Sequence, residues 1–146
     1  MNVYQLLSST LIGTTSMTLY SYLISKIERK NYREPRLLNK LIEKLPIPRD
    51  VHPSTGWILH YKVGFGFALF YHLTWNKYKP FRNMPTAITM GLINGLLGIG
   101  VWDRVFKIHP HPPDIDHRAF YRHLIIAHGI YGAGAYFGYL LTRERK

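Results

Sequence analysis

The stretch ILHYKVGFGFALFYHLT, residues 58–74, decides how the fold is interpreted. Its apolar and glycine-containing composition is typical of a transmembrane helix. It also carries three ionisable side chains, which are costly in hydrocarbon and mark either a soluble core or a functional polar site. These side chains are His60, Lys62 and His72. The rest of the chain has to distinguish between the two interpretations.

Two tryptophans lie at the ends of this stretch, Trp57 and Trp75. On a helix their separation is about 27 Å, so we expect the two rings to occupy the two interfacial belts of a membrane. Including its flanks, this apolar block covers residues 54–75. Three other blocks of similar length occur, at residues 3–25, 84–102 and 120–141.

About 20 apolar residues in a helix cross a hydrocarbon layer of about 30 Å. We therefore predict an all-α polytopic membrane protein, with four transmembrane helices in a single domain covering residues 1–146. The alternative is a soluble or dimeric helical bundle. The chain contains no cysteine, which excludes disulfides, thiolate catalysis and cysteine-ligated metal centres.

Glycines recur in these blocks at spacings that allow helices to pack closely in lipid. Gly91 and Gly95 form one small-xxx-small pair, and Gly134 and Gly138 form another. We predict helix-packing roles for Gly64, Gly66, Gly91, Gly95, Gly132, Gly134 and Gly138.

The basic residues predict an orientation. The formal net charge is +11, and twelve of the 19 Lys and Arg fall in residues 26–50 and 103–122. They lie between apolar blocks rather than along a face interleaved with aromatics, which argues against a nucleic-acid partner. The positive-inside rule predicts that loops 26–53 and 103–119 lie in the cytoplasm. The basic residues Arg143, Arg145 and Lys146 oppose this orientation.

Within the first basic loop, residues 36–45 have an amphipathic pattern bounded by Pro35 and Pro46. We predict a short interfacial helix whose leucine face enters an anionic inner leaflet, with anionic lipids as partners of residues 26–50. The alternative is a helix that docks on a partner protein or on a second copy of the chain.

The chain also contains a candidate internal repeat. An offset of 68 residues aligns residues 58–74 with IAHGIYGAGAYFGYLLT at residues 126–142, and seven positions are identical. His60 then matches His128, and each is followed four residues later by a glycine. The pattern predicts a parallel 2+2 duplication, although glycine, leucine and tyrosine are common enough in spans to match by chance.

The matched histidines are the candidate cofactor-binding residues. Two imidazoles on different helices, His60 and His128, could hold a b-type haem, form a proton relay, or bind a transition metal together with His123. The alternative is that they are neutral, hydrogen-bonded packing histidines. For the charged groups Lys62 and Asp103 we expect structural charge pairing, with Arg104 and Arg122 as further partners of Asp103.

A second cluster lies in the loop KIHPHPPDIDHR, residues 107–118. Imidazole and carboxylate groups suit zinc or manganese, so the loop is a candidate metal site. Its candidate ligands are His109, His111, Asp114 and His117. The alternative is a rigid proline-rich connector, with Asp116 capping the last span and Ser54 or Thr55 capping the second.

No catalytic residue is predicted, because none of the familiar hydrolase, metalloprotease or phosphate-binding motifs is present. The segments GTTSMT, EPRLLNKL, GWILHYKVGF and FYRHLIIAHGIYG resemble a group of small four-span inner-membrane proteins of bacteria that carries no assigned activity. The resemblance implies the fold and the location only. We expect a structural or accessory subunit of a membrane assembly, and as the alternative a redox subunit or small transporter using His60 and His128. A lipid-modifying enzyme is a third, weaker interpretation.

Overall fold

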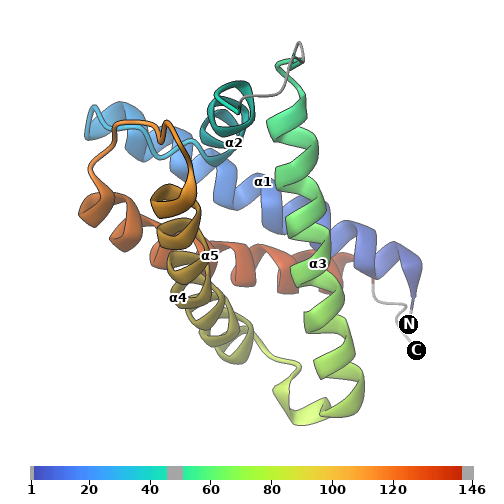
Figure 1. Ribbon diagram of the computed structural model, residues 1–146. Coiled ribbons are helices and arrows are strands. Elements are labelled where there is room, and N and C mark those ends of the chain that lie inside the picture. The colour runs from blue at the N-terminus through green and yellow to red at the C-terminus, as the bar shows by residue number, and fades with distance from the viewer. Residues whose placement is uncertain (1, 46–50, 143–146) are drawn as a thin grey trace.

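The computed structural model describes residues 2–45 and 51–142 and contains five α-helices and one short 3₁₀ helix (Figure 1). In chain order they are α1 Val3–Ile27, α2 Glu34–Glu43, α3 Thr55–Lys77, η1 Lys79–Phe81, α4 Met84–Ile108 and α5 His117–Leu141. The prediction of an all-α fold is confirmed. Pro46 and the basic residues Arg143, Arg145 and Lys146 lie outside the described residues.

The prediction of a membrane protein is supported in part. Of the helices described, only α4 and α5 are long and apolar enough to cross a membrane by length and composition. Helix α1 has sufficient length but carries many hydroxyl side chains, and α3 carries two histidines and Lys62. These polar groups lower the hydropathy of both helices.

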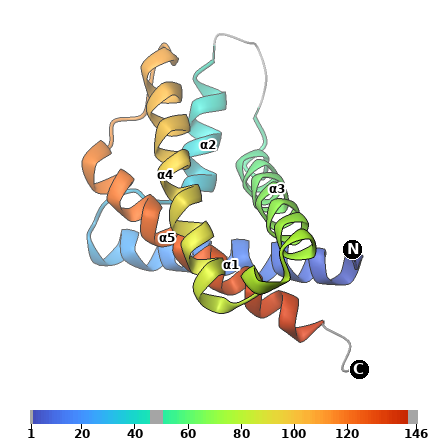
Figure 2. The ribbon, with the colours of Figure 1, turned by 90° about the horizontal axis from the view of Figure 1, so that it is seen from below.

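The long helices are arranged as an antiparallel pair crossed by two further helices. Helices α1 and α5 run side by side in opposite directions (Figures 1 and 2). Helix α3 packs on α1 and α2, whereas α4 packs on α5. Figure 2 shows α3 and α4 standing apart from each other on one side of α1. The space between them contains the candidate site described below.

Glycines set the close approach of these helices. A Cβ atom at Gly91 would overlap the backbone carbonyl of His128, and one at Gly95 would lie 2.7 Å from the Ile125 Cα atom. Gly132 packs in the same way on the backbone of Ala87. Gly134 and Gly138 pack on the backbone of α1, and Gly64 packs on the Thr14 side chain. Gly66 does not have the predicted packing role, because a Cβ atom there would meet nothing within 4 Å.

Side-chain caps fix the beginning of three helices. Asn2, Asn83 and Asp116 each accept a hydrogen bond from a backbone N–H in the first turn of α1, α4 and α5 respectively. The prediction for Asp116 is confirmed. Pro85 lies in the first turn of α4, where its missing N–H is tolerated. Ser54 precedes α3 but makes no side-chain cap.

One aromatic cluster contradicts the predicted interfacial belts. Trp57 is partly exposed, but Trp75 is fully buried. The Trp75 ring packs edge-on against Tyr71, Tyr136 and Tyr139. The prediction for Trp75 is wrong because spacing along a helix does not show which side of the helix faces its neighbours.

Helix α2 is present and amphipathic, but its leucine face packs on the protein. Leu37 and Leu41 are buried in a cluster with Tyr32, Phe106 and Phe120, from the α1–α2 connection, α4 and α5. Leu38 and Ile42 are half-buried and Leu45 is exposed. The predicted insertion of this whole face into lipid is therefore wrong, because the helix covers one end of the helical bundle instead.

The two basic loops lie together at that end. Lys30 Nζ pairs with Asp116 Oδ2 at 2.7 Å. His109 Nε2 donates to the carbonyl oxygen of Leu41 at 2.7 Å. The connection after α1 and the connection between α4 and α5 are thus on the same side of the molecule. The predicted placement of both in the cytoplasm requires this.

We expect Gly91→Ala to destabilise the fold by about 1–3 kcal/mol, because its Cβ atom meets backbone that cannot rotate away. Gly100→Ala on the same helix is the matched control, because nothing lies within 4 Å of its Cβ position. That control should be neutral or stabilising by up to about 1 kcal/mol, the helix-propensity gain. Equilibrium unfolding in detergent micelles measures both, and equal destabilisation would contradict the α4–α5 packing.

Candidate functional site

The buried face of α1 is lined with hydroxyl groups. Five leucine or isoleucine side chains of α1 are instead strongly exposed. The buried hydroxyl residues are Ser9, Thr10, Thr14, Thr18, Ser21 and Ser25. Buried hydroxyls need partners, so this face determines which side chains of the other helices can pack on it.

Three imidazoles from other helices meet this face. His60 Nε2 lies 2.9 Å from Thr18 Oγ1, and His123 Nε2 lies 2.9 Å from Ser21 Oγ. His72 Nε2 lies 3.1 Å from Ser9 Oγ. Each of these histidines is buried. The hydrogen bonds attach α3 to α1 at two levels and α5 to α1 at one.

His123 is held between two aromatic rings. Tyr20 and Tyr32 stack on its two faces, with ring centroids 5.0 and 4.4 Å away and nearly parallel planes. Its Nδ1 atom is buried without a hydrogen-bond partner. The ring is therefore fixed with Nε2 directed at Ser21.

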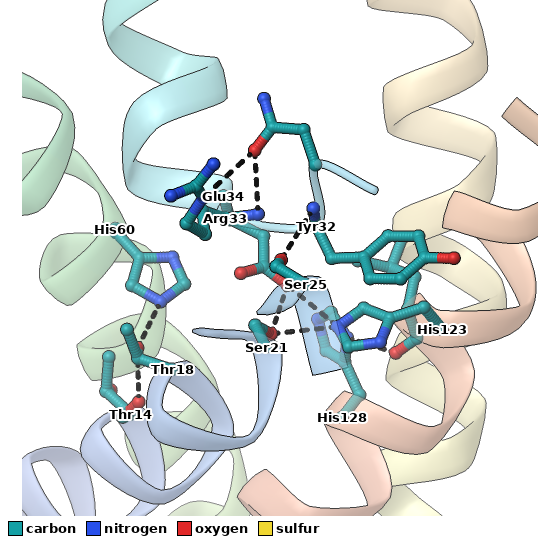
Figure 3. A network of polar contacts seen from close by, with 12 residues as sticks. Thr14, Thr18, Ser21, Ser25, Tyr32, Arg33, Glu34, His60, His123 and His128 are labelled. Atoms are coloured by element: carbon teal, nitrogen blue, oxygen red, sulfur yellow. Dashed lines mark hydrogen bonds and ion pairs between the residues drawn. The ribbon is translucent and has the colours of Figure 1, made fainter. Parts of the chain in front are cut away.

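Ser21 extends the contact of His123 to Glu34, the first residue of α2. Its hydroxyl donates to Glu34 Oε1 at 3.0 Å, so it accepts from His123 Nε2–H. Figure 3 shows the Glu34 carboxyl group between this chain of bonds and the His60 ring. The other carboxyl oxygen, Oε2, is buried and has no hydrogen-bond partner.

The burial of Glu34 makes the protonated acid its favoured form. Desolvation raises its pKa to about 8, although the hydrogen bonds from Ser21 and from its own backbone oppose the shift. Because Oε1 accepts from Ser21, the proton belongs on Oε2. At neutral pH the residue therefore presents an O–H donor with no partner.

Glu34 lines a cavity of about 250 Å³ between α3 and α4. All five α-helices contribute to its walls, which are mainly aliphatic and aromatic. The polar residues at the wall are Thr14, Glu34, His60, Asn94, His128 and Tyr131. Lys and Arg are missing from the described residues that line it. The cavity is therefore apolar with a small polar region.

The histidines predicted to bind a cofactor both line this cavity. Thr18 donates its own hydroxyl hydrogen to the Thr14 carbonyl at 2.7 Å, so it accepts from His60 Nε2–H. His128 Nδ1–H donates to the Leu124 carbonyl at 2.8 Å. In the neutral rings the lone pairs are then on His60 Nδ1 and His128 Nε2. Neither atom has a hydrogen-bond partner in the described part of the chain.

These residues do not fit a haem held between the two histidines. His60 Nε2 is already bonded to Thr18, and the cavity is smaller than the roughly 300–1,000 Å³ typical of sites for drug-sized ligands. The transition-metal interpretation finds no support either. Among residues 2–45 and 51–142, no three His, Cys, Asp or Glu side chains are grouped to hold a metal ion.

Two of the loop histidines, His109 and His117, contact neighbouring groups. Both nitrogens of His109 are engaged, Nε2 with Leu41 O and Nδ1 with the His111 backbone N–H at 3.1 Å. The His117 ring packs edge-on against Phe106 at 4.8 Å, and His111 and Asp114 are exposed. The geometry therefore gives the predicted metal site no support.

The expected pairing of Asp103 involves a different residue. Asp103 Oδ2 pairs with Lys107 Nζ at 2.6 Å, and Oδ1 accepts from the Tyr121 hydroxyl at 3.3 Å. Lys62 is exposed on α3 and makes no ion pair with the described residues. The spacing of Lys107 four residues after Asp103 was visible in the sequence, and it is the usual helical pairing distance.

The candidate repeat has a mixed outcome. The aligned halves are α1 with α3 and α4 with α5. Gly64 of α3 packs on α1, and the matching Gly132 of α5 packs on α4, so each glycine contacts the other long helix of its own half. However, a repeat would match the close pair α1–α5 with a close pair α4–α3. Helices α3 and α4 stand apart instead. The parallel 2+2 duplication stays a prediction.

Sequence reasoning missed Glu34 and the hydroxyl face of α1. The signal was present, because Thr10, Thr14, Thr18, Ser21 and Ser25 recur at spacings of three and four residues. Glu34 gave no comparable signal, since an acidic residue beside Pro35 suits an ordinary helix beginning.

No protein-family model, curated protein or solved structure matches the chain. The resemblance to small inner-membrane proteins of bacteria therefore stays a prediction, and the site rests on the residues of this chain alone.

Glu34→Gln should change how stability depends on pH. Between the unfolded pKa near 4.5 and the folded pKa of about 8, only the folded state keeps the proton, so the stability of the parent protein falls as pH rises. The loss relative to Glu34→Gln should approach about 1.4 kcal/mol per pH unit in this window and cease above it. Unfolding midpoints of both proteins from pH 5 to 9 measure this difference. A constant difference across the window would contradict the buried neutral acid.

Proposed function

We propose that this chain is a four-span integral protein of the bacterial inner membrane, with α1, α3, α4 and α5 as its spans, and that it binds a small molecule in its interior cavity. The observation that carries the proposal is the distribution of polarity. Large apolar side chains lie outside, whereas hydroxyl, imidazole and amide groups lie inside.

The exposed apolar residues occur on all four long helices. On α1 they recur at spacings of four or eight residues, and exposed apolar residues occur likewise on α3, α4 and α5. They include Leu7, Leu11, Leu19, Leu23 and Ile27 on α1, Ile58, Phe65, Phe70 and Leu73 on α3, Leu92, Ile93, Leu96, Leu97 and Val101 on α4, and Ile126, Phe137 and Leu140 on α5. In water such continuous apolar faces would favour aggregation, whereas lipid solvates them.

The buried groups fit the same environment. The buried Thr10 and Thr18 donate to carbonyls four residues earlier in α1, and the half-buried Thr74 and Thr142 do the same at the ends of α3 and α5. Other hydroxyls bond to imidazoles between helices, as Ser9 does. Polar groups satisfied between helices are how spans tolerate such side chains in hydrocarbon. This supports α1 and α3 as spans despite their lower hydropathy.

We place the α2 end of the molecule in the cytoplasm. Segments 26–50 and 103–122 hold twelve of the 19 Lys and Arg of the chain, and Lys30 of the first segment pairs at this end with Asp116 of the second. Positive charge on the cytoplasmic side is retained during insertion, and it also favours contact with anionic lipids. The ends of α1 and α5 near Val3 and Leu141 then lie on the opposite side.

The cavity favours a binding role over a purely structural one. A structural or accessory subunit gains nothing from a partly polar internal space, because a filled core is more stable. A buried acid with one unpaired oxygen, Glu34 Oε2, adds a further cost that folding alone does not require. We therefore prefer the binding role to the accessory role expected from the sequence.

Single-cysteine variants test the membrane arrangement, because the chain has no cysteine of its own. We expect Lys79→Cys in η1 to react with an impermeant maleimide in intact cells. His111→Cys should react only after the membrane is opened. Leu19→Cys and Leu96→Cys, on exposed apolar faces, should react poorly in both cases. Equal reaction of Leu19→Cys and His111→Cys in opened cells would contradict the lipid-facing assignment.

A further inference from the structure

We infer that the cavity binds the head of a neutral, hydroxyl-bearing lipid, which enters sideways from the membrane between α3 and α4. The class comprises lipid-like alcohols and phenols, whose shared chemistry is one O–H group on an apolar chain. The inference rests on the proposed membrane location and adds the chemistry of the ligand.

The cavity opens on the apolar exterior of the molecule. Three of its lining residues are also strongly exposed, Val63 on α3 at 54% and Leu97 and Val101 on α4 at 65% and 63%. These side chains form the mouth, and they belong to the same faces that we assign to lipid. A ligand with an apolar chain can therefore leave its tail in the bilayer and place only its head inside.

The inner end of the cavity has donors and acceptors without partners. Glu34 Oε2 is buried and unpaired, and Thr14 Oγ1 is also buried and unpaired. His60 Nε2 and His128 Nδ1 each carry the ring hydrogen, because each donates a hydrogen bond. The other nitrogens, His60 Nδ1 and His128 Nε2, are therefore free to accept one. Gly98 leaves space beside the His128 ring, since a Cβ atom there would lie 3.7 Å from Nε2.

A hydroxyl group matches this set better than other head groups do. It can donate to an imidazole nitrogen and accept from the protonated Glu34 at once. A carbonyl could not satisfy either imidazole. A phosphate would meet no Lys or Arg among the described lining residues and would lie beside an acid. The volume also suits a head group rather than a whole lipid.

Helix α2 closes the cytoplasmic end of the cavity. Leu38 and Leu41 line it together with Glu34, and the bonds from Ser21 hold the carboxyl group in place. A head group that enters from the side therefore stops at Glu34 and does not pass through to the cytoplasm.

A matched set of probes tests the inference on the purified protein in detergent. The probes share one tail and differ in the head group: farnesol, farnesyl methyl ether, farnesal and farnesyl phosphate. Farnesol at a hundredfold excess over its Kd should raise the unfolding midpoint by about 5–10 °C. The methyl ether, which cannot donate, should bind about tenfold more weakly. A quinol with a decyl tail, kept reduced, distinguishes phenols from alcohols as the source of the hydroxyl group.

Two exposed leucines locate the binding. Leu97→Trp places a large ring at the mouth and should weaken farnesol binding at least tenfold. Leu96→Trp is the matched control, because Leu96 is 58% exposed on the same helix but does not line the cavity. Both side chains face outward, so neither change disturbs the packing between helices.

His128→Leu tests the polar end, with His72→Leu as control because His72 is buried but does not line the cavity. Only His128→Leu should abolish the preference for farnesol over its methyl ether. Equal affinity of the parent protein for all four probes, no binding of any, or equal effects of Leu96→Trp and Leu97→Trp would overturn the inference. Extraction of the protein by alkaline carbonate tests the membrane location separately, because it does not depend on any probe.

Discussion

The hydrogen bonds between the hydroxyl face of α1 and the imidazoles of α3 and α5 are the constraint on which the rest of the structure depends. A buried hydroxyl or imidazole without a partner costs about 1–3 kcal/mol, so these groups specify which helices meet and at what level. Ser9 and Thr18 fix two points along α3, and Ser21 fixes α5. In the proposed membrane location the hydrophobic effect would not sort helices in this way, because lipid tails are as apolar as leucine.

Different helix pairs are held together by different interactions, α4 and α5 by glycine packing and α1 and α3 by side-chain hydrogen bonds. The contacts of α4 with α5 are made through Gly91, Gly95 and Gly132, where backbones touch. The contacts of α1 with α3 depend more on side-chain hydrogen bonds. The glycine contacts leave no space between α4 and α5. The hydrogen bonds to α1 hold α3 at a distance from α4. The cavity is a consequence of this difference, since no comparable contact draws α3 and α4 together.

The sequence allowed the helices to be predicted well and their partners poorly. Apolar runs, Pro85 and the Asp116 cap are local signals, so element positions and the all-α class could be derived from them. His60 and His128 were also identified, because imidazole in an apolar run is conspicuous. Trp75, the leucine face of α2 and Glu34 were misjudged or missed. Each depends on which surface of a helix meets another helix far away in the chain, and periodicity does not encode that choice.

Glu34 shows how the fold and the site are connected. Its carboxyl group receives one hydrogen bond from Ser21, and the same hydroxyl accepts from His123, so the acid is placed by contacts that also hold α1 to α5. Its second oxygen gains nothing from the protein. An apolar side chain at this point would remove the unpaired oxygen, but it would also leave the Ser21 hydroxyl without its acceptor. The acid lines a cavity whose mouth carries exposed apolar side chains, and in the proposed membrane location a ligand's hydroxyl group would complete its hydrogen bonding.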